Sequence, residues 1–194
     1  SSAMSGVTND LIKKSKHISN NFSSSERDAL ISSGEQIACA LIAGKLNSLG
    51  YRSQSWMSWQ IPILTEGAYN FSRIIKINKR KISNYLKSGG IPIIAGFQGI
   101  NSQNRITTLG RGGSDASAIM CAKFFKAKKC LIFTDVDGVY TTDPNNFKNA
   151  KKIKAISYEE MLEMASLGAK VMQPHSIQDA RINRIEIDVQ SSFI

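Results

Sequence analysis

A glycine-rich segment at residues 107–115, Thr-Thr-Leu-Gly-Arg-Gly-Gly-Ser-Asp, most constrains what this chain can fold into. The apolar run at 91–95 predicts a strand buried on both faces, and the small residues at 114–126 predict a helix. Glycines permit positive φ and close backbone approach, so several N–H groups of the loop can bind one anion. The helix that follows adds its positive N-terminal end, and Arg111 adds a fork of donors. An anion site is predicted; a structural loop with a capping Asp115 is the alternative.

The rest of the chain alternates strand patterns with helical patterns, which predicts an α/β layered sheet. Thr8 and Ser157 are expected to cap helices, and Gly50 to end the long second helix. That long helix carries apolar residues on one side, namely Leu30, Ile37, Leu41 and Leu46. Helices are predicted at 8–18, 25–50, 79–87, 114–126, 157–167 and 174–182; strands at 73–77, 91–95, 130–134 and 185–189; a broken extended segment at 56–64; and a loop at 96–113.

Length and charge narrow the class of protein. The chain has 194 residues, which suits one domain, and no apolar run approaches the roughly 20 residues that span a bilayer. Its net charge is +10, but the lysines are spread over helical segments and do not alternate with aromatic residues. We therefore expect a solvated basic surface, with no nucleic-acid partner and no membrane partner.

The cysteines and histidines indicate neither a disulfide framework nor a metal site. Cys39, Cys121 and Cys130 are scattered among apolar residues, which is typical of buried free thiols in a reducing cytosol. His17 and His175 have no partner at ligand spacing, so no protein metal site is expected. These features predict a cytoplasmic location.

A second segment, at residues 133–144, follows the apolar run at 130–134, which predicts another buried strand. Open α/β sheets place their ligands at the carboxyl ends of such strands. Gly138 lets the chain turn, and Tyr140 offers a ring to a purine or a ribose. Acidic turns of this kind are also common as plain turns or as metal loops, and both alternatives remain open at this point.

Two shorter segments complete the set. Residues 2–9 place small hydroxyl side chains and a glycine before a helix, which simple helix capping would also explain. Residues 32–35, Ser-Ser-Gly-Glu, place a glutamate beside a glycine inside a helix, where glycine costs about 1 kcal/mol relative to alanine. A solvated glutamate beside a close-packing glycine is the alternative.

Taken together and in this order, the four segments resemble the aspartate kinases of the amino-acid kinase family. Further similarities are Gly-Phe-Gln-Gly at 96–99 and Gly-Ala-Lys-Val at 168–171, so the resemblance covers nearly the whole chain. Gly-Arg-Gly-Gly-Ser-Asp at 110–115 is the most specific part. The resemblance implies a three-layer αβα sandwich with a mostly parallel central sheet, incomplete at its N-terminus.

The resemblance also implies roles for single residues. The acid substrate would be held by Ser2, Thr8, Glu35, Arg111 and Ser114. Asp115 and Lys170 would be catalytic, with Asp115 near the transferring phosphate. The nucleotide would be bound by Thr134, Asp135, Gly138 and Tyr140.

The implied reaction transfers the γ-phosphate of Mg-ATP to the β-carboxylate of L-aspartate. The product, 4-phospho-L-aspartate, begins the route to lysine, threonine and methionine. Residues 1–194 are expected to form a catalytic-domain fragment of a homo-oligomeric protein. The family's opening strand, which ends in Lys-Phe-Gly-Gly-Thr-Ser, and its C-terminal regulatory domains are expected to be absent. Asn145 stands where the family often has arginine, so the resemblance does not imply a second cationic contact to ATP from this loop.

Three alternatives remain at this stage. Another member of the family would phosphorylate glutamate, acetylglutamate, carbamate or UMP, and the nucleotide segment does not exclude these acceptors. A binding module without catalysis, such as a basic nucleic-acid binder, would show affinity that falls steeply with salt. An inactive homologue would keep the segments without the reaction.

Overall fold

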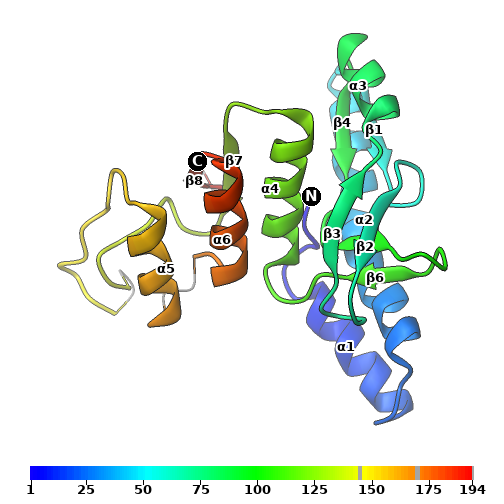
Figure 1. The fold of residues 1–194 in the computed structure, drawn as a ribbon, viewed down its shortest axis with the longest axis horizontal. Coiled ribbons are helices and arrows are strands. Elements are labelled where there is room, and N and C mark those ends of the chain that lie inside the picture. Colours follow the sequence, from blue (N-terminus) through cyan, green and yellow to red (C-terminus); the bar gives the residue numbers. More distant parts are fainter. Residues whose placement is uncertain (144–145, 169–170, 194) are drawn as a thin grey trace. The chain divides into compact units, whose positions relative to one another are not determined.

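The computed structural model describes residues 1–143, 146–168 and 171–193. The chain forms two compact units, Ser1–Ser117 and Ala118–Ile194. The division falls within helix α4 (Gly113–Phe125), whose predicted bounds are confirmed to within one residue. Figure 1 shows the elements of each unit along the chain.

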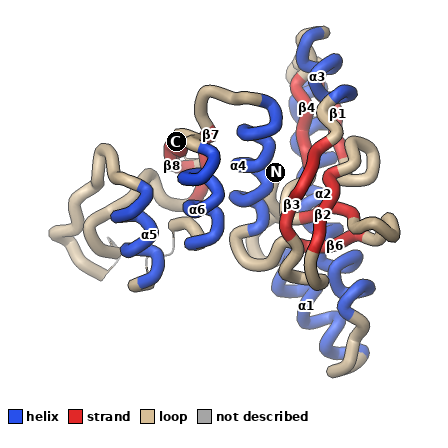
Figure 2. Tube along the Cα trace, in the orientation of Figure 1, coloured by secondary structure: helices blue, strands red, loops and turns tan. Residues whose placement is uncertain are grey.

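The first unit places long helices beside short strands. Its helices are α1 (Val7–Ile18), α2 (Ser24–Ser48) and α3 (Arg80–Lys87), and its strands are β1 (Ser53–Trp56), β2 (Ile63–Glu66), β3 (Arg73–Ile77), β4 (Ile91–Ile94), β5 (Gln98–Ile100) and β6 (Ile106–Thr108). Strands β1 and β4 pair in parallel, and a second sheet has the order β3-β2-β5-β6. In that sheet β2 and β5 are parallel, while the β2–β3 and β5–β6 pairs are antiparallel. Helix α2 packs against β1, β4 and β6, behind the strands drawn in red in Figure 2.

Helix α2 buries a different side from the predicted one. Ile37 and Leu41 are exposed, at 49% and 58% of their surface, so the predicted apolar side does not face the strands. The buried side consists of small and polar residues, namely Asp28, Ser32, Gly34, Glu35, Ala38, Cys39 and Ala43, with Ile31 among them. Small side chains let the helix approach closely enough for direct contacts, since the Cys39 thiol donates to the Ile93 carbonyl at 2.9 Å.

Helix α1 begins without the predicted cap. Its N-cap is Gly6, in the left-handed conformation at φ 82°, and Thr8 lies within the first turn. Gly34 explains how α1 lies against α2. A Cβ at position 34 would lie 3.0 Å from the Ala3 Cβ and 3.2 Å from the Val7 Cγ1. The close-packing interpretation of this glycine is therefore correct.

The predicted loop at 96–113 contains a short antiparallel hairpin. Strands β5 and β6 pair Gln98 with Thr108 and Ile100 with Ile106. Strands of this length carry too few residues to show a period in the sequence. Strand β4 lies where predicted, but Ile91 is 40% exposed and the other three residues are only partly buried, so the predicted burial on both faces is wrong.

The second unit is built around a parallel pair of strands. Strand β7 (Cys130–Thr134) pairs in parallel with β8 (Ile187–Ser191), and α5 (Tyr158–Ser166) packs against α6 (Pro174–Asn183). The core of the unit includes Ile119, Ile132, Met161, Ile177 and Ala180. Strand β7 alternates, because Leu131 and Phe133 are exposed, so its predicted full burial is wrong. Ser157 caps α5 in a capping box with Glu160, as predicted.

The predicted α/β class is confirmed, with parallel pairing in three of the strand pairs. Cys39, Cys121 and Cys130 form no disulfide among the described residues; Cys39 and Cys130 are buried, as predicted, whereas Cys121 is partly exposed. Among the described helices, none combines the length and apolar character that a bilayer crossing requires.

Candidate functional site

Glu35 on helix α2 is a buried acidic side chain of the first unit. The side chain is 3% exposed, and its Oε1 accepts a hydrogen bond from the Ala3 N–H at 3.2 Å. Its Oε2 is buried and has no hydrogen-bond partner among the described residues. Burial raises the pKa of Glu35 to about 7, although the bond from Ala3 opposes the shift. The solvated-glutamate alternative is therefore excluded, and one carboxylate oxygen is left for a ligand.

The chain start, the loop after β4 and the first turn of α4 lie together. The Gly96 N–H donates to the Ser1 carbonyl at 3.0 Å. A Cβ at Gly96 would lie 2.8 Å from that carbonyl oxygen and 3.4 Å from the Ser114 Cα, so only glycine fits there. The neighbouring Ser2 is exposed, and Ser114 is half-buried. The structure thus brings the segments of Ser2 and Ser114 together, and Ala3 links the first of them to Glu35.

The glycine loop before α4 leaves its arginine available. Gly110 has φ 77°, and a Cβ there would lie 2.7 Å from the Asn70 carbonyl oxygen. The Gly113 N–H donates to the Gly110 carbonyl at 3.0 Å and closes a turn around Arg111. Arg111 is exposed and makes no ion pair or side-chain hydrogen bond with any residue that the structure describes. Its guanidinium can therefore bind an external carboxylate or phosphate.

The first turn of α4 supplies a second acidic group. Asp115 is half-buried there, and burial raises the pKa of its carboxyl. The loop beside it is held by Ser117, which accepts from the Phe97 N–H at 2.9 Å and donates to the Gly113 carbonyl at 2.8 Å. Phe97 itself has φ 65°, an uncommon conformation for a non-glycine residue that clusters at functional sites. Thr8 lies on α1, one residue after the Val7 side chain that approaches Gly34.

Asp28 is a functional candidate that the sequence analysis missed. It is fully buried on α2 and lies on the same face of the helix as Glu35. Its carboxylate accepts hydrogen bonds from the Asn70 and Thr108 N–H groups. The signal was available in the sequence, because an aspartate seven residues before Glu35 lies on the same side of a helix. The apolar residues of the helix suggested the opposite side as the buried one.

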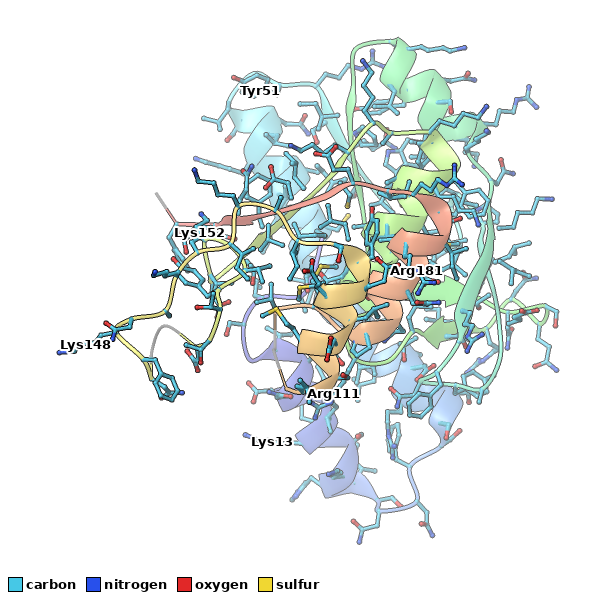
Figure 3. All side chains as sticks on the ribbon, turned by 60° about the vertical axis from the view of Figure 1, so that its left-hand side comes forward. Lys13, Tyr51, Arg111, Lys148, Lys152 and Arg181 are labelled. Atoms are coloured by element: carbon cyan, nitrogen blue, oxygen red, sulfur yellow. The ribbon has the colours of Figure 1, made fainter. Side chains whose placement is uncertain are left out.

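The second unit presents the acidic turn after β7. Thr134 donates to the Asp135 carboxylate at 3.1 Å, and Tyr140 donates to the Asp137 Oδ1 at 2.8 Å. Lys152 donates to the Asp137 Oδ2 at 3.2 Å, and Figure 3 shows Lys152 on the same yellow loop as Lys148. The hydrogen bond from Tyr140 and the ion pair with Lys152 hold the pKa of Asp137 below its usual value.

Lys152 packs closely over the turn. A Cβ at Gly138 would lie 2.6 Å from the Lys152 Cε, so a larger residue there would displace the end of the lysine side chain. The chain that carries Lys152 is also bridged to Tyr140. Sequence reasoning did not select Lys152, because its contact with Asp137 spans a segment with no regular pattern. Lys170 and Asn145, which the sequence analysis singled out, lie outside the described residues.

Comparison with known proteins identifies the family. The model described as "Amino acid kinase family" matches residues 1–191. The chain belongs to the amino acid kinase family. It is 47% identical over 192 residues to an aspartokinase from Geobacillus stearothermophilus. The match covers 99% of this chain and 47% of that protein.

Solved structures of the same family agree. The aspartate kinase from Synechocystis is 40% identical, with a TM-score of 0.83, over 99% of this chain and 32% of that one. Aspartokinase III from E. coli, in complex with aspartate and ADP, is 30% identical with a TM-score of 0.83, over 95% of this chain and 42% of that one. The chain therefore spans about half the length of the curated relatives that it matches.

Proposed function

We propose that this chain is the catalytic portion of an aspartate kinase, which transfers the γ-phosphate of ATP to the β-carboxylate of L-aspartate. Two independent facts support the proposal. The curated relatives at 44–47% identity over nearly the whole chain are aspartokinases. The first unit also offers one anionic and one cationic group, Glu35 and Arg111, to a small ligand.

The observation that carries the proposal is the buried Glu35 oxygen without a partner among the described residues. A buried carboxylate is costly unless a cation or a donor compensates it. The α-ammonium of an amino acid supplies both in one group. Acetylglutamate, carbamate and UMP carry no ammonium, so Glu35 favours a free amino acid over these acceptors.

Arg111 would bind a carboxylate of that amino acid through its planar fork. Ser2, Thr8 and Ser114 would complete the acid site with hydroxyl groups, which suit the remaining oxygens. Aspartate carries two carboxylates, so one can be held by the arginine while the other reacts.

The reaction needs alignment and charge neutralisation more than proton transfer. An oxygen of the β-carboxylate attacks the γ-phosphorus, the bond to the β–γ bridging oxygen breaks, and ADP leaves with the electron pair. Because a carboxylate is already ionised at neutral pH, no general base is required. Asp115 would orient the groups around the transferring phosphate, and Lys170 would neutralise its charge.

Thr134, Asp135, Gly138 and Tyr140 would bind the nucleotide. Magnesium would enter with the ATP phosphates, where it neutralises the developing charge. The donor chemistry fits this arrangement, since Mg²⁺ keeps several waters and needs only one or two carboxylates beside phosphates. No group of three His, Cys, Asp or Glu side chains forms a metal cluster within 1–143, 146–168 and 171–193. A single carboxylate, such as that of Asp135 beside the proposed nucleotide residues, would meet this small requirement.

The test is a substrate panel on the complete protein that carries this chain. Acyl phosphate trapped as the hydroxamate, together with ADP release, is expected with L-aspartate and not with glutamate, acetylglutamate, carbamate or UMP. Turnover with glutamate or UMP but not aspartate would replace the assignment by another member of the family. No turnover with any acceptor would indicate an inactive homologue.

We also propose a cytoplasmic location and a homo-oligomeric complete protein. Cys39, Cys121 and Cys130, which form no disulfide among the described residues, suit a reducing compartment. Light scattering of the complete protein would test the oligomeric state.

A further inference from the structure

We propose that Asp28 is a positioning residue, which fixes the Arg111 loop against helix α2 so that Arg111 and Glu35 bind one substrate. This inference rests on the proposed function, in which Arg111 and Glu35 hold the acid substrate. Asp28 itself would touch neither substrate nor nucleotide.

Three hydrogen bonds converge on this one carboxylate. Its Oδ2 accepts from the Thr108 N–H at 2.7 Å and from the Asn70 N–H at 2.9 Å. Its Oδ1 accepts from the Thr108 hydroxyl at 3.1 Å. None of these donors belongs to α2, so the side chain joins the helix to the end of strand β6 and to the loop between β2 and β3.

Those two segments also contact each other. The Ser72 N–H donates to the Thr108 carbonyl at 3.1 Å. The Asn70 carbonyl lies against Gly110, where a Cβ would approach it to 2.7 Å. Asn70 has φ 65°, in the left-handed region that asparagine adopts more readily than most other non-glycine residues. Asp28 therefore holds the residue whose carbonyl lies against the glycine loop.

Only two residues separate Thr108, which binds Asp28, from Arg111. Thr108 is the last residue of β6, and Leu109 donates from its N–H to the Phe97 carbonyl at 3.0 Å. Gly110 and Arg111 follow directly, with no regular element between them. A shift at Thr108 would thus move the Arg111 backbone.

The same helix sets the distance to Glu35. Asp28 and Glu35 are seven residues apart on the buried side of α2, which is about 10 Å along the helix axis. A helix is stiff over two turns, so anchoring the loop at Asp28 fixes where Arg111 lies relative to Glu35. A substrate with an ammonium and two carboxylates needs that spacing to be constant.

Burial determines how the Asp28 carboxyl acts. Asp28 is 0% exposed, and burial raises the pKa of its carboxyl, against the lowering effect of its hydrogen bonds. The Asp28 side chain therefore acts through its hydrogen bonds rather than through its charge. An asparagine can reproduce them, since its oxygen can accept from both N–H groups while its NH2 donates to the Thr108 hydroxyl.

The experiment compares Asp28→Ala, Asp28→Asn and Thr108→Val in the complete protein. Asp28→Ala is expected to raise the KM for L-aspartate by about tenfold or more and to leave the KM for ATP within about twofold. Thr108→Val, which removes only the hydroxyl donor, is expected to raise the KM for aspartate by about threefold. Asp28→Asn is expected to stay within about threefold of the wild type because it keeps all three hydrogen bonds. Glu26→Gln, an exposed acid on the same helix, is the matched control and should change nothing.

A second readout does not depend on activity. Amide hydrogen exchange at Asn70 and Thr108 should accelerate in Asp28→Ala, stay slow in Asp28→Asn, and stay unchanged at Ile91, whose N–H is bound to the Arg52 carbonyl. If the wild type made no acyl phosphate from aspartate, the proposed function would fail, while this exchange measurement would still test the positioning role of Asp28.

The inference is overturned if Asp28→Ala leaves the KM for aspartate and both amides unchanged. Equal rises in the KM for ATP and for aspartate would also overturn it, because they would indicate general loss of structure. If the KM for aspartate in Asp28→Asn rose as much as in Asp28→Ala, the effect would come from the charge of Asp28 and not from its hydrogen bonds. If Asp28→Ala does not fold, Thr108→Val decides the question. An unchanged KM for aspartate in that variant would argue against the positioning role of Asp28, and a raised KM for aspartate would support it.

Discussion

The two units hold their carboxylates in opposite ways. On helix α2, Asp28 and Glu35 are almost fully buried, and burial raises the pKa of both carboxyls. In the turn after β7, Asp137 is exposed, and its pKa is lowered by the Tyr140 hydroxyl and the Lys152 ammonium. One unit has carboxylates with few compensating charges, and the other has a carboxylate that is already paired.

Buried and exposed carboxylates should respond differently to substitution and to salt. Buried groups respond to geometry, because each missing hydrogen bond leaves an unsolvated polar atom. Exposed ion pairs respond to salt and contribute little to stability. We therefore expect substitutions in the first unit to change substrate binding strongly, and substitutions in the turn of the second unit to change it weakly and in a salt-dependent way.

The largest expected effect is at Arg111. Arg111→Ala should lower kcat/KM for aspartate by about 100-fold or more, because it removes a charge-assisted, two-pronged contact. Arg111→Lys should recover only part of this loss, since an ammonium cannot match the fork. Arg105→Ala, which removes an exposed arginine paired with Glu26, is the control. A change below threefold in Arg111→Ala would contradict the role of this side chain.

Glu35 should come next, with a pH signature. Glu35→Gln should raise the KM for aspartate by about tenfold or more, the loss expected for a hydrogen bond to a charged group. In the wild type, that KM should fall as the pH rises through about 7, where the carboxyl ionises and can bind an ammonium. The variant should lose this pH dependence. A wild-type KM that is flat between pH 6 and 8 would argue against the ammonium contact.

The same residue should also affect stability without ligand. The pKa of Glu35 is about 7 in the folded chain and 4.5 in its ordinary state, so the folded state binds the proton more tightly. The free energy of unfolding should therefore fall as the pH rises from about 4.5 to about 7, and the penalty is complete above 7. At pH 8, Glu35→Gln should be more stable than the wild type by on the order of 2 kcal/mol. Urea unfolding at pH 4 and pH 8 would check this, since equal stabilities are expected at pH 4.

Lys152 should give a small, salt-sensitive effect. Lys152→Ala should raise the KM for ATP by about threefold at low salt and by less at high salt, because the ion pair with Asp137 is exposed. The KM for aspartate should not change. Lys148→Ala in the same loop is the matched control (Figure 3). An equal effect of both substitutions would mean that only the general charge of the loop matters.

The smallest expected effect on activity is at Ser157. Ser157→Ala removes one half of the capping box of α5 and should destabilise the protein by about 1 kcal/mol. Thermal melting would measure the loss. Both KM values should stay unchanged, and a change in either would mean that α5 supports a binding residue.

The sequence by itself determined the class and most of the candidate residues. Strand and helix patterns predicted α/β, and the bounds of α3, α4, β3 and β7 were predicted to within about a residue. The glycine loop around Arg111 was predicted because a run of glycines before a helix is a local signal that needs no tertiary contact. The Ser157 cap is equally local.

Only the tertiary structure decided which side of α2 is buried and what Glu35 and Asp28 do. The apolar residues Ile37 and Leu41 suggested one side, whereas the strands pack against the small and polar side. Partners such as Asn70 and Thr108 are 42 and 80 residues from Asp28, and no period or spacing connects them. A buried polar group takes its meaning from the donors that reach it, and those donors are fixed by the packing of distant segments.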